Sequence, residues 1–382
     1  MVIQTISPTG VIYWVWWMAR IVWFDALTSK QILIALSLKR FLQPYGYDVL
    51  VTGRRYDAIE GIVRALGVEV PLVGGYGGDA YEKLREEVSR MGLLLEILSK
   101  RVSDLIAGIS YPNPVEARIV YGLGKPLAIL SDTPHSIHAH RLTVPLASFL
   151  IHSWCIDSAE WKHCLLPHTR LYSYRGVDEL SWILYLEEIQ DQKHIRSLGL
   201  SEREYVVIRP EETKASYYVW GDKWDLWIRI SEDLIKRGYK VVILPRYGDQ
   251  RAYMEERLRN HIERERVVIP PVEKAIGPAL AKHALAVITG GGTIAREAAL
   301  YGVPGVTLFP LELPVDRCLS SLGLPIKRAS SIEEIMGIID NAGSNIELFT
   351  AKAKEIIASM EPPQKTLLEI LREVENHGGG GY

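Results

Sequence analysis

The sequence predicts an α/β protein with two Rossmann-like lobes that face a cleft and C-terminal helices that pack back on the first lobe. Its 382 residues are enough for two domains, each with its own hydrophobic core. From Ile21 onwards, short β-rich runs alternate with segments of helical period, which is the pattern of parallel sheets joined by crossover helices. The alternation occurs twice, before and after residues 168–200, where a helical stretch lacks strand repetition.

The first series of elements defines an N-terminal lobe. Its strands are expected at residues 21–25, 48–52, 68–73, 105–109, 127–130 and 149–153. Segments of helical period lie between them, at residues 30–42, 57–66, 80–101 and 115–121.

The second series defines a C-terminal lobe, with strands expected at residues 205–209, 240–244, 267–269, 284–289 and 305–309. Its helices are expected at residues 223–237, 250–263, 293–301 and 332–341. From residue 345 to about 376 the chain is helical, interrupted at Pro362 and Pro363. We therefore expect lobes over residues 18–168 and 204–341, a connection over 169–203 and closing helices over 342–376.

Composition excludes several classes of protein. Apolar residues make up 48% and charged residues 24%, the balance of a folded globular protein. The net charge of −2 provides no bulk positive field, so a nucleic-acid partner is not expected. The cysteines Cys155, Cys164 and Cys318 show no metal-binding spacing, and we interpret them as reduced thiols of a cytoplasmic protein.

The N-terminal region contains one apolar run, at residues 10–17. The run is too short to cross a bilayer, and no basic residue precedes it as in a signal peptide. No transmembrane segment is therefore expected. We expect the natural start at Met18, the alternative being that residues 1–17 form an extra surface segment.

The strongest motif is a glycine-rich turn between a buried strand and a helix. Gly290, Gly291 and Gly292 precede a helix that is expected to begin at Thr293. Successive glycines let backbone amides approach an anion, and the helix N-terminus adds partial positive charge, as in diphosphate sites. Glu297 lies one turn into the helix, where its carboxylate could accept hydrogen bonds from ribose hydroxyls. The alternative is a tight turn whose glycines serve packing.

A second candidate site follows the strand at residues 127–130. Asp132 and His135 are placed to form a carboxylate and imidazole pair for proton transfer. Six of the ten histidines lie between His135 and His168, but their spacing matches no zinc signature, and no metal site is expected. The alternative is a polar loop in which Asp132 caps a helix.

Three further segments have candidate roles. Arg209 and Glu211 end a strand, where the guanidinium offers a fork to phosphate and Glu211 orients it or binds a sugar hydroxyl; the alternative is a surface ion pair. Asp178 and Glu179 either cap a helix or face the cleft as catalytic carboxylates. The glycine-rich loop at residues 74–78 either shapes an acceptor pocket or is an ordinary loop.

Several motifs of other enzyme classes are absent from the sequence. It lacks G-x-x-x-x-G-K-[ST], G-x-S-x-G and H-E-x-x-H, and no G-x-G-x-x-G follows the first strand. P-loop enzymes, serine hydrolases, zincins and ordinary dehydrogenases are therefore disfavoured, and no cofactor is expected. A D-x-D pair that holds a divalent ion against a diphosphate is also absent, which favours a metal-free diphosphate site.

Four segments together resemble the largely archaeal family designated domain of unknown function 354: residues 132–135, 174–179, 209–211 and 290–304. That family is similar to nucleotide-sugar enzymes of the glycosyltransferase-B fold, including the UDP-N-acetylglucosamine 2-epimerase and the glycosyltransferase that makes lipid II. The resemblance covers roughly residues 19–375. In those enzymes the donor-binding glycines contact the diphosphate and a glutamate contacts the ribose, which implies these roles for Gly290, Gly291, Gly292, Thr293 and Glu297.

Two departures separate this chain from the epimerases. Their N-terminal G-T-R-P-E run is absent, and residues 131–135 replace their histidine-containing run after a later strand. The resemblance therefore implies metal-independent transfer of a sugar from a nucleoside-diphosphate donor of UDP type in the second lobe to an unknown acceptor in the first. The alternatives are a sugar-nucleotide epimerase and a non-catalytic nucleotide-sugar-binding protein. The assembly is left open between monomer and homodimer.

Overall fold

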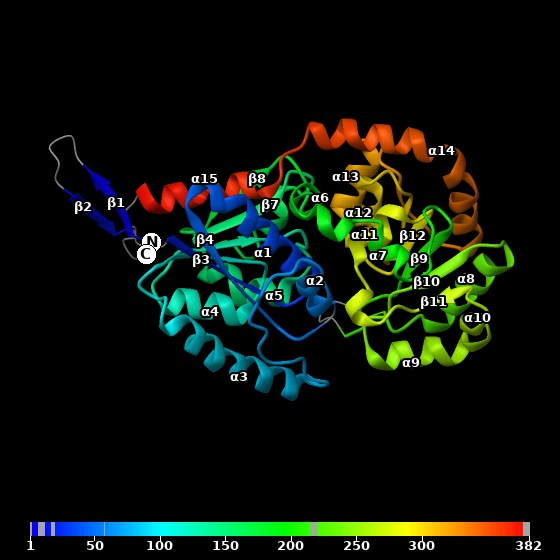
Figure 1. Cartoon of the computed structure of the whole chain (residues 1–382), viewed down its shortest axis with the longest axis horizontal. Helices are drawn as coiled ribbons and strands as arrows, with labels where there is room; N and C mark the ends of the chain where they lie inside the picture. Colours follow the sequence, from blue (N-terminus) through cyan, green and yellow to red (C-terminus); the bar gives the residue numbers. More distant parts are fainter. Residues whose placement is uncertain (1, 7–11, 17–19, 57, 215–219, 377–382) are drawn as a thin grey trace.

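Two six-stranded parallel sheets form the framework of the molecule (Figure 1). The computed structural model describes residues 2–6, 12–16, 20–56, 58–214 and 220–376. The first sheet has the strand order β4-β3-β5-β6-β7-β8 and the second the order β11-β10-β9-β12-β13-β14. The predicted fold class is confirmed.

The first sheet is built from β3 (Arg20–Ala26), β4 (Tyr47–Gly53), β5 (Leu105–Ser110), β6 (Leu127–Leu130), β7 (Phe149–Ser153) and β8 (Arg170–Tyr174). The inner strand β3 is buried on both faces, as the unbroken apolar run at Ile21, Val22 and Trp23 shows. Its helices are α1 (Ser29–Leu42), α2 (Ile59–Ala65), α3 (Ala80–Ser99), α4 (Pro114–Gly122) and α5 (Ile137–Thr143), with short 3₁₀ turns η1 (Gln43–Tyr45), η2 (Val144–Leu146) and η3 (Ser158–Trp161).

The second sheet contains β9 (Tyr205–Arg209), β10 (Lys240–Ile243), β11 (Val267–Val268), β12 (Ala286–Thr289), β13 (Gly305–Thr307) and β14 (Ile326–Arg328). Its helices are α8 (Trp224–Lys236), α9 (Gly248–Arg257), α10 (Arg259–Glu263), α11 (Gly277–His283), α12 (Thr293–Leu300), α13 (Pro314–Ser321) and α14 (Ile332–Ala358), and it includes the turn η5 (Val272–Lys274). Between the lobes lie α6 (Leu180–Tyr185), η4 (Glu187–Gln190) and α7 (Lys193–Arg196).

One apolar cluster extends through both lobes, beside a further cluster that belongs to the second lobe alone. The shared cluster joins Phe24 of the first sheet, Trp182 of α6 and Val207 of the second sheet, all fully buried. Continuous packing of this kind resists relative motion, because parting the lobes would expose apolar surface to water. The carboxyl ends of both sheets are therefore held facing one another.

Helix α15 (Pro363–Asn376) returns to the first lobe, as predicted (Figure 1). The side-chain amide of Gln364 donates to Ser37 Oγ of α1 at 2.8 Å, and Tyr47 OH donates to Glu375 Oε2 at 2.7 Å. Helix α14, by contrast, stays on the second lobe, where Gly302 at the end of α12 packs against it. A Cβ at Gly302, whose φ is 78°, would meet Thr350 Cα at 2.4 Å.

Several predicted elements were wrong. The strand expected at residues 68–73 is reduced to an isolated bridge between Gly53 and Leu72. The connection expected to lack strands contains β8, which pairs with β7 and extends the first sheet to Tyr174. The edge strand β14 was not predicted, and the helix expected at residues 250–263 is divided into α9 and α10. Residue 57, where α2 was expected to begin, lies outside the described residues.

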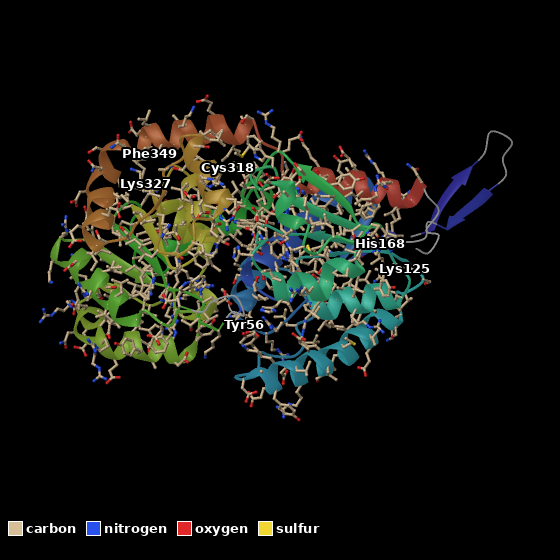
Figure 2. All side chains as sticks on the ribbon, turned by 180° about the vertical axis from the view of Figure 1, so that it is seen from behind. Tyr56, Lys125, His168, Cys318, Lys327 and Phe349 are labelled. Atoms are coloured by element: carbon tan, nitrogen blue, oxygen red, sulfur yellow. A yellow bond between two sulfur atoms is a disulfide. The ribbon has the colours of Figure 1, made fainter. Side chains whose placement is uncertain are left out.

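The interpretation of the cysteines as reduced thiols was also wrong for two of the three. Cys155, which follows β7, forms a disulfide with Cys318 of α13, and the two are 163 residues apart in sequence (Figure 2). The bond therefore joins the two lobes. Cys164 is a free, buried thiol.

The described part of the N-terminal segment forms an antiparallel hairpin of β1 (Val2–Ile6) and β2 (Ile12–Trp16), which is a sheet of its own. Met18, the expected start, lies outside the described residues. Among the helices that the structure describes, none combines the length and apolar character needed to span a bilayer.

Candidate functional site

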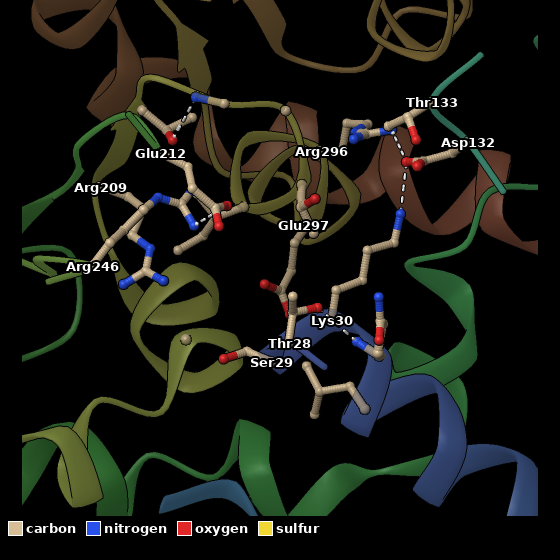
Figure 3. Close-up of a pocket in the computed structure, with 18 of the residues that line it drawn as sticks. Thr28, Ser29, Lys30, Asp132, Thr133, Arg209, Glu212, Arg246, Arg296 and Glu297 are labelled. Carbon is tan, nitrogen blue, oxygen red and sulfur yellow. Dashed lines mark hydrogen bonds and ion pairs between the residues drawn. The ribbon is translucent and has the colours of Figure 1, made fainter. Parts of the chain in front are cut away.

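A cavity of about 340 Å³ lies between the carboxyl ends of the two sheets (Figure 3). The first lobe contributes polar groups that directly follow its strands, among them Thr28, Ser29, Lys30, Tyr111, Asp132 and His135. The second lobe contributes Arg209, Glu212, Arg246, Gly291, Gly292, Thr293, Arg296 and Glu297. Ligands of open α/β sheets bind at this edge.

The three glycines after β12 have different roles. A Cβ at Gly290 would lie 2.6 Å from Glu211 N, a backbone atom, so this position requires glycine for packing. A Cβ at Gly292 would lie 2.8 Å from Leu313 Cδ1 and from Arg296 Nη2, the ends of two side chains that would have to shift. At Gly291 the nearest atom to a Cβ would be Arg246 Nη2, at 3.6 Å. Gly291 is therefore the position that leaves room on the cavity side.

Two helix N-termini meet at the cavity, one from each lobe. Helix α1 begins at Ser29, after the cap Thr28, and α12 begins at Thr293. Within the described chain, no side chain caps α12. Each N-terminus carries a partial positive charge, so the cavity favours an anion from two directions.

Three arginines of the second lobe line the cavity, and two of them, Arg209 and Arg246, are held by backbone carbonyl oxygens (Figure 3). Arg209 Nη1 donates to the carbonyl oxygen of Leu244 at 3.1 Å. Arg246 Nε donates to the carbonyl oxygen of Pro210 at 3.0 Å, and its Nη1 lies 3.3 Å from Glu212 Oε2. Backbone contacts thus fix both guanidinium groups beside the glycine turn.

Asp132 lies at the centre of a buried charged cluster. Its Oδ2 is 2.6 Å from Lys30 Nζ and 2.8 Å from Arg296 Nη1, and its Oδ1 accepts a hydrogen bond from Tyr111 OH. Because Arg296 belongs to α12, this contact joins the lobes. Burial alone would raise the pKa of Asp132, but Lys30 and Arg296 hold it well below its usual range.

Asp178 and Glu179 extend the cluster beneath the cavity. Asp178 Oδ2 lies 2.8 Å from Lys30 Nζ, and its Oδ1 accepts a hydrogen bond from Tyr174 OH. Glu179 Oε1 lies 3.3 Å from Arg296 Nε. Both carboxyl groups are almost fully buried and neither lines the cavity, so the structure does not place them where they would touch a substrate.

Carboxyl groups outnumber cations in this cluster, and burial raises the pKa of two of them. Burial raises the pKa of Glu179 to about 7, even though Arg296 and Lys30 act in the opposite direction. Burial likewise raises the pKa of Asp316, 3.4 Å from Arg296 Nε, to about 6. At pH 7 Glu179 is therefore partly protonated and Asp316 mostly ionised, so protonation only partly reduces the negative charge that the two cations must balance.

Glu297 is the acidic residue of the glycine motif that lines the cavity. Trp182 Nε1 donates to its Oε1 at 2.5 Å, which fixes the carboxyl group from the side of α6. Burial raises its pKa to about 8, and the hydrogen bond from Trp182 offsets only part of this rise. At neutral pH the side chain is therefore mostly protonated and can donate as well as accept a hydrogen bond.

His135 lines the cavity on the first-lobe side, and its ring centroid lies 6.1 Å from that of Phe309. Burial lowers its pKa below the ordinary value, although Asp132 acts in the opposite direction. The imidazole is therefore neutral at pH 7 and able to accept a proton.

Glu211 differs from its predicted place. It is 1% exposed and does not line the cavity. Its Oε1 accepts from the amide of Lys223 at 2.7 Å, and its Oε2 accepts from Trp227 Nε1. Glu211 therefore anchors the start of α8, and Gly290 packs against its backbone rather than facing the cavity.

Several cavity residues were not predicted, among them Lys30, Tyr111, Arg246 and Arg296. The first three follow β3, β5 and β10, so their position after predicted strands was an available signal. Arg296 directly precedes Glu297 in the glycine motif. Across the described residues, no group of three or more His, Cys, Asp or Glu side chains is placed to hold a metal ion.

Comparison with solved structures places the fold. UDP-GlcNAc 2-epimerase from Neisseria meningitidis, bound to UDP-GlcNAc, is similar with a TM-score of 0.64 and 14% identity over 92% of this chain and 100% of that one. A glycosyltransferase from Rickettsia africae is similar with a TM-score of 0.55 and 10% identity over 93% and 98%. The two-lobed fold is thus glycosyltransferase-B-like.

Sequence comparison identifies closer relatives. An uncharacterized protein of Methanocaldococcus jannaschii, MJ0665, is 27% identical over 333 residues, which are 85% of this chain and 92% of that protein. The family of proteins of unknown function called DUF354 matches residues 21–373. Because this match covers both lobes and α15, the chain belongs to the DUF354 family.

Proposed function

We propose that this protein binds a nucleoside-diphosphate sugar of UDP type in the cavity and transfers the sugar to an acceptor held by the first lobe. The observation that carries the proposal is the convergence of two helix N-termini and two arginines on one cavity. The similar epimerase from N. meningitidis is bound to UDP-GlcNAc, which agrees with a nucleotide-sugar ligand.

The diphosphate would lie between the glycine turn and the N-terminus of α12. Gly291 offers space there, and Arg209 and Arg246 supply charge beside it. These groups would also stabilise the negative charge that develops on the departing diphosphate. We therefore propose that catalysis requires no divalent ion, and expect activity to survive chelation by EDTA.

The ribose would lie against Glu297. Because the carboxyl group is mostly protonated at pH 7, its hydroxyl can donate to one ribose oxygen while its other oxygen accepts from Trp182. This assignment keeps the predicted role of Glu297 but changes its chemistry from a charged acceptor to a neutral donor.

His135 is the better candidate for the base that takes the proton from the acceptor hydroxyl. Asp132 is paired with two cations and its pKa is held low, so its affinity for a proton is weak. His135 faces the cavity as a neutral imidazole. In this proposal Asp132 positions Lys30 and Arg296 while His135 moves the proton.

Sugar-nucleotide epimerisation is a second candidate, favoured by one observation. The cavity holds a protonated carboxyl group, Glu297, on one lobe and a neutral imidazole, His135, on the other. An acid and a base on opposite sides of a sugar suit the removal and return of a proton. An epimerase would form an isomer from the donor alone, whereas a transferase needs an acceptor, so product analysis with and without acceptor separates them.

Calorimetric titration with UDP and UDP-sugars tests the shared donor site. A valine at position 291 fits without a close contact, so the Gly291→Val variant should fold. Its side chain would block the approach of the diphosphate, so we expect UDP to bind at least tenfold more weakly. The control is Gly337→Val in α14, at an exposed position where a Cβ meets nothing within 4 Å. Unchanged UDP affinity in a folded Gly291→Val variant, checked by circular dichroism, would rule out this site.

A further inference from the structure

A second cavity, of about 190 Å³, lies beside the first at the boundary between the lobes. Its wall includes Leu27, next to Thr28 of the first cavity, and Arg54, two residues from Tyr56 of the first cavity. Figure 2 shows Tyr56 at this boundary, where its hydroxyl lies 3.4 Å from Glu212 Oε1 of the second lobe. The two cavities are thus separated by only a few side chains.

Four cationic side chains line the second cavity, against two carboxylates. Two of the cations have acidic partners: Arg90 contacts Asp25 at 2.6 Å, and Lys214 Nζ contacts Asp249 at 3.0 Å. The two carboxylates are Glu86 and Glu87. Glu86 Oε2 accepts a hydrogen bond from the backbone amide of Gly75 at 3.1 Å.

Neither of the remaining cations, Arg54 and Lys83, makes an ion pair with a carboxylate among the described residues, although Glu87 lies near enough to interact with Arg54 electrostatically. Arg54 Nη2 donates to the carbonyl oxygen of Leu27 at 3.0 Å, and its guanidinium lies 4.7 Å from the ring centroids of both Tyr56 and Tyr76. Lys83 Nζ lies 3.3 Å from the carbonyl oxygen of Lys214 and 4.9 Å from the Tyr76 ring centroid.

Two buried donors in this cavity wall lack partners. Arg54 Nε and Arg90 Nε are both inaccessible and make no hydrogen bond, and Arg90 as a whole is only 2% exposed. Burial lowers the pKa of Arg54, and the opposing effects of Tyr56, Tyr76 and Glu212 do not offset it. A buried cation without an ion-pair partner, such as Arg54, is costly, and an incoming anion would reduce that cost.

The glycine-rich loop at residues 74–78 shapes this cavity. Gly74 has a φ of 69°, and a Cβ there would meet Arg90 Cγ at 2.3 Å. A Cβ at Gly77 would meet Lys83 N at 2.3 Å. These glycines let the loop lie directly on α3, which brings Tyr76 over Lys83 and Arg54.

We propose that the second cavity binds an anionic group of the acceptor, a phosphate or a carboxylate, through Arg54 and Lys83. Its assignment to the acceptor rests on the proposed function, because the acceptor must reach from the first lobe to the sugar in the larger cavity. Arg54 and Lys83 come from the first lobe, and Lys214 of the second lobe closes the wall. The stacked guanidinium offers its donors in a fixed orientation to an oxyanion.

The test is calorimetric titration with inorganic phosphate and with acetate, at constant ionic strength, in the absence of UDP and with UDP saturating. We expect one of these anions to bind in both conditions, and at least tenfold more weakly to Arg54→Gln and to Lys83→Gln. UDP affinity should be unchanged in both variants. The matched control is Lys100→Gln, an exposed lysine at the C-terminal end of the same helix, which should bind like wild type.

The outcomes separate this proposal from the proposed function. The anion that binds more tightly identifies the acceptor group as phosphate or carboxylate. An anion that UDP displaces and that both variants bind like wild type would lie in the larger cavity and would overturn the proposal, as would the failure of both anions to bind. If the wild type does not bind UDP, that result would instead contradict the donor site, and the proposal of anion binding at Arg54 would be unaffected. Lys83→Gln keeps the test decisive if Arg54→Gln fails to fold, since Lys83 makes few contacts.

Discussion

Replacement of Glu297 by glutamine should make the stability of the protein less dependent on pH. Glutamine has the shape of the protonated carboxyl group and keeps an oxygen that accepts from Trp182, 2.5 Å away in the wild type. It cannot ionise, however. The wild-type carboxyl group is buried and its pKa is raised to about 8, so in the folded state it keeps its proton at neutral pH.

The size of the effect follows from the proton balance. In the unfolded chain a glutamate has a pKa of about 4.3. Between that pH and about 8, the folded state therefore binds one proton more than the unfolded state. The stabilisation due to this proton is complete below the unfolded pKa and is lost as pH rises through the folded pKa. The free energy of unfolding then falls by about 1.4 kcal/mol per pH unit, or about 2.7 kcal/mol between about pH 5.5 and 7.5.

Urea denaturation of both proteins over this pH range measures the difference. The wild type should lose about 2 to 3 kcal/mol more than Glu297→Gln, because Glu179 and Asp316 are common to both proteins. Replacement of the exposed Glu347 by glutamine is the control, and it should leave the wild-type slope unchanged. Parallel pH profiles for wild type and Glu297→Gln would refute the claim that Glu297 is protonated in the folded protein.

Three further changes have defined outcomes. Arg296→Met should lower the free energy of unfolding by about 3 to 5 kcal/mol in urea titrations, because it leaves Asp132 buried with one cation fewer; a loss below about 1 kcal/mol would contradict this. The change Cys155→Ser should cost about 2 to 4 kcal/mol, and Cys318→Ser the same, since either removes the disulfide between the lobes; a dithiothreitol-insensitive wild-type melting curve would argue against that bond. His135→Gln should reduce kcat by about 10² to 10⁴-fold with UDP affinity retained, and a fully active variant would exclude His135 as the base.

Hydrophobic periodicity was sufficient to predict most of the fold. Strands such as β3 and β9 are continuous apolar runs that follow from burial on both faces of a parallel sheet. Edge elements have weaker patterns. The strand β8 has only one fully buried residue, Tyr174, and β14 has three residues, so neither was distinguishable from a loop.

The site was predictable where chemistry coincides with strand ends, and unpredictable where it depends on distant contacts. Asp132 and Gly291 follow strands and reach the cavity, as the topology requires. Glu211 also follows a strand, yet Trp227 and the amide of Lys223 hold it away from the cavity. Whether a residue at a strand end faces the cavity depends on such distant contacts, and the local sequence does not encode them.

Long-range pairing was the least accessible information. The ion pair of Asp132 with Arg296 spans 164 residues, and the disulfide of Cys155 with Cys318 spans 163. Neither spacing resembles a known motif. Such contacts depend on the docking of two separately built sheets, so they emerge only from the complete tertiary structure.

The return of α15 to the first lobe has a consequence for folding during synthesis. Gln364 contacts Ser37 and Glu375 contacts Tyr47, across 327 and 328 residues of chain. The apolar face of α1 that α15 covers therefore stays uncovered while the whole second lobe is translated. Contacts of such sequence separation form slowly, and exposed apolar surface favours aggregation in the meantime. The nascent first lobe therefore remains prone to aggregation until α15 has been synthesised and has packed onto α1.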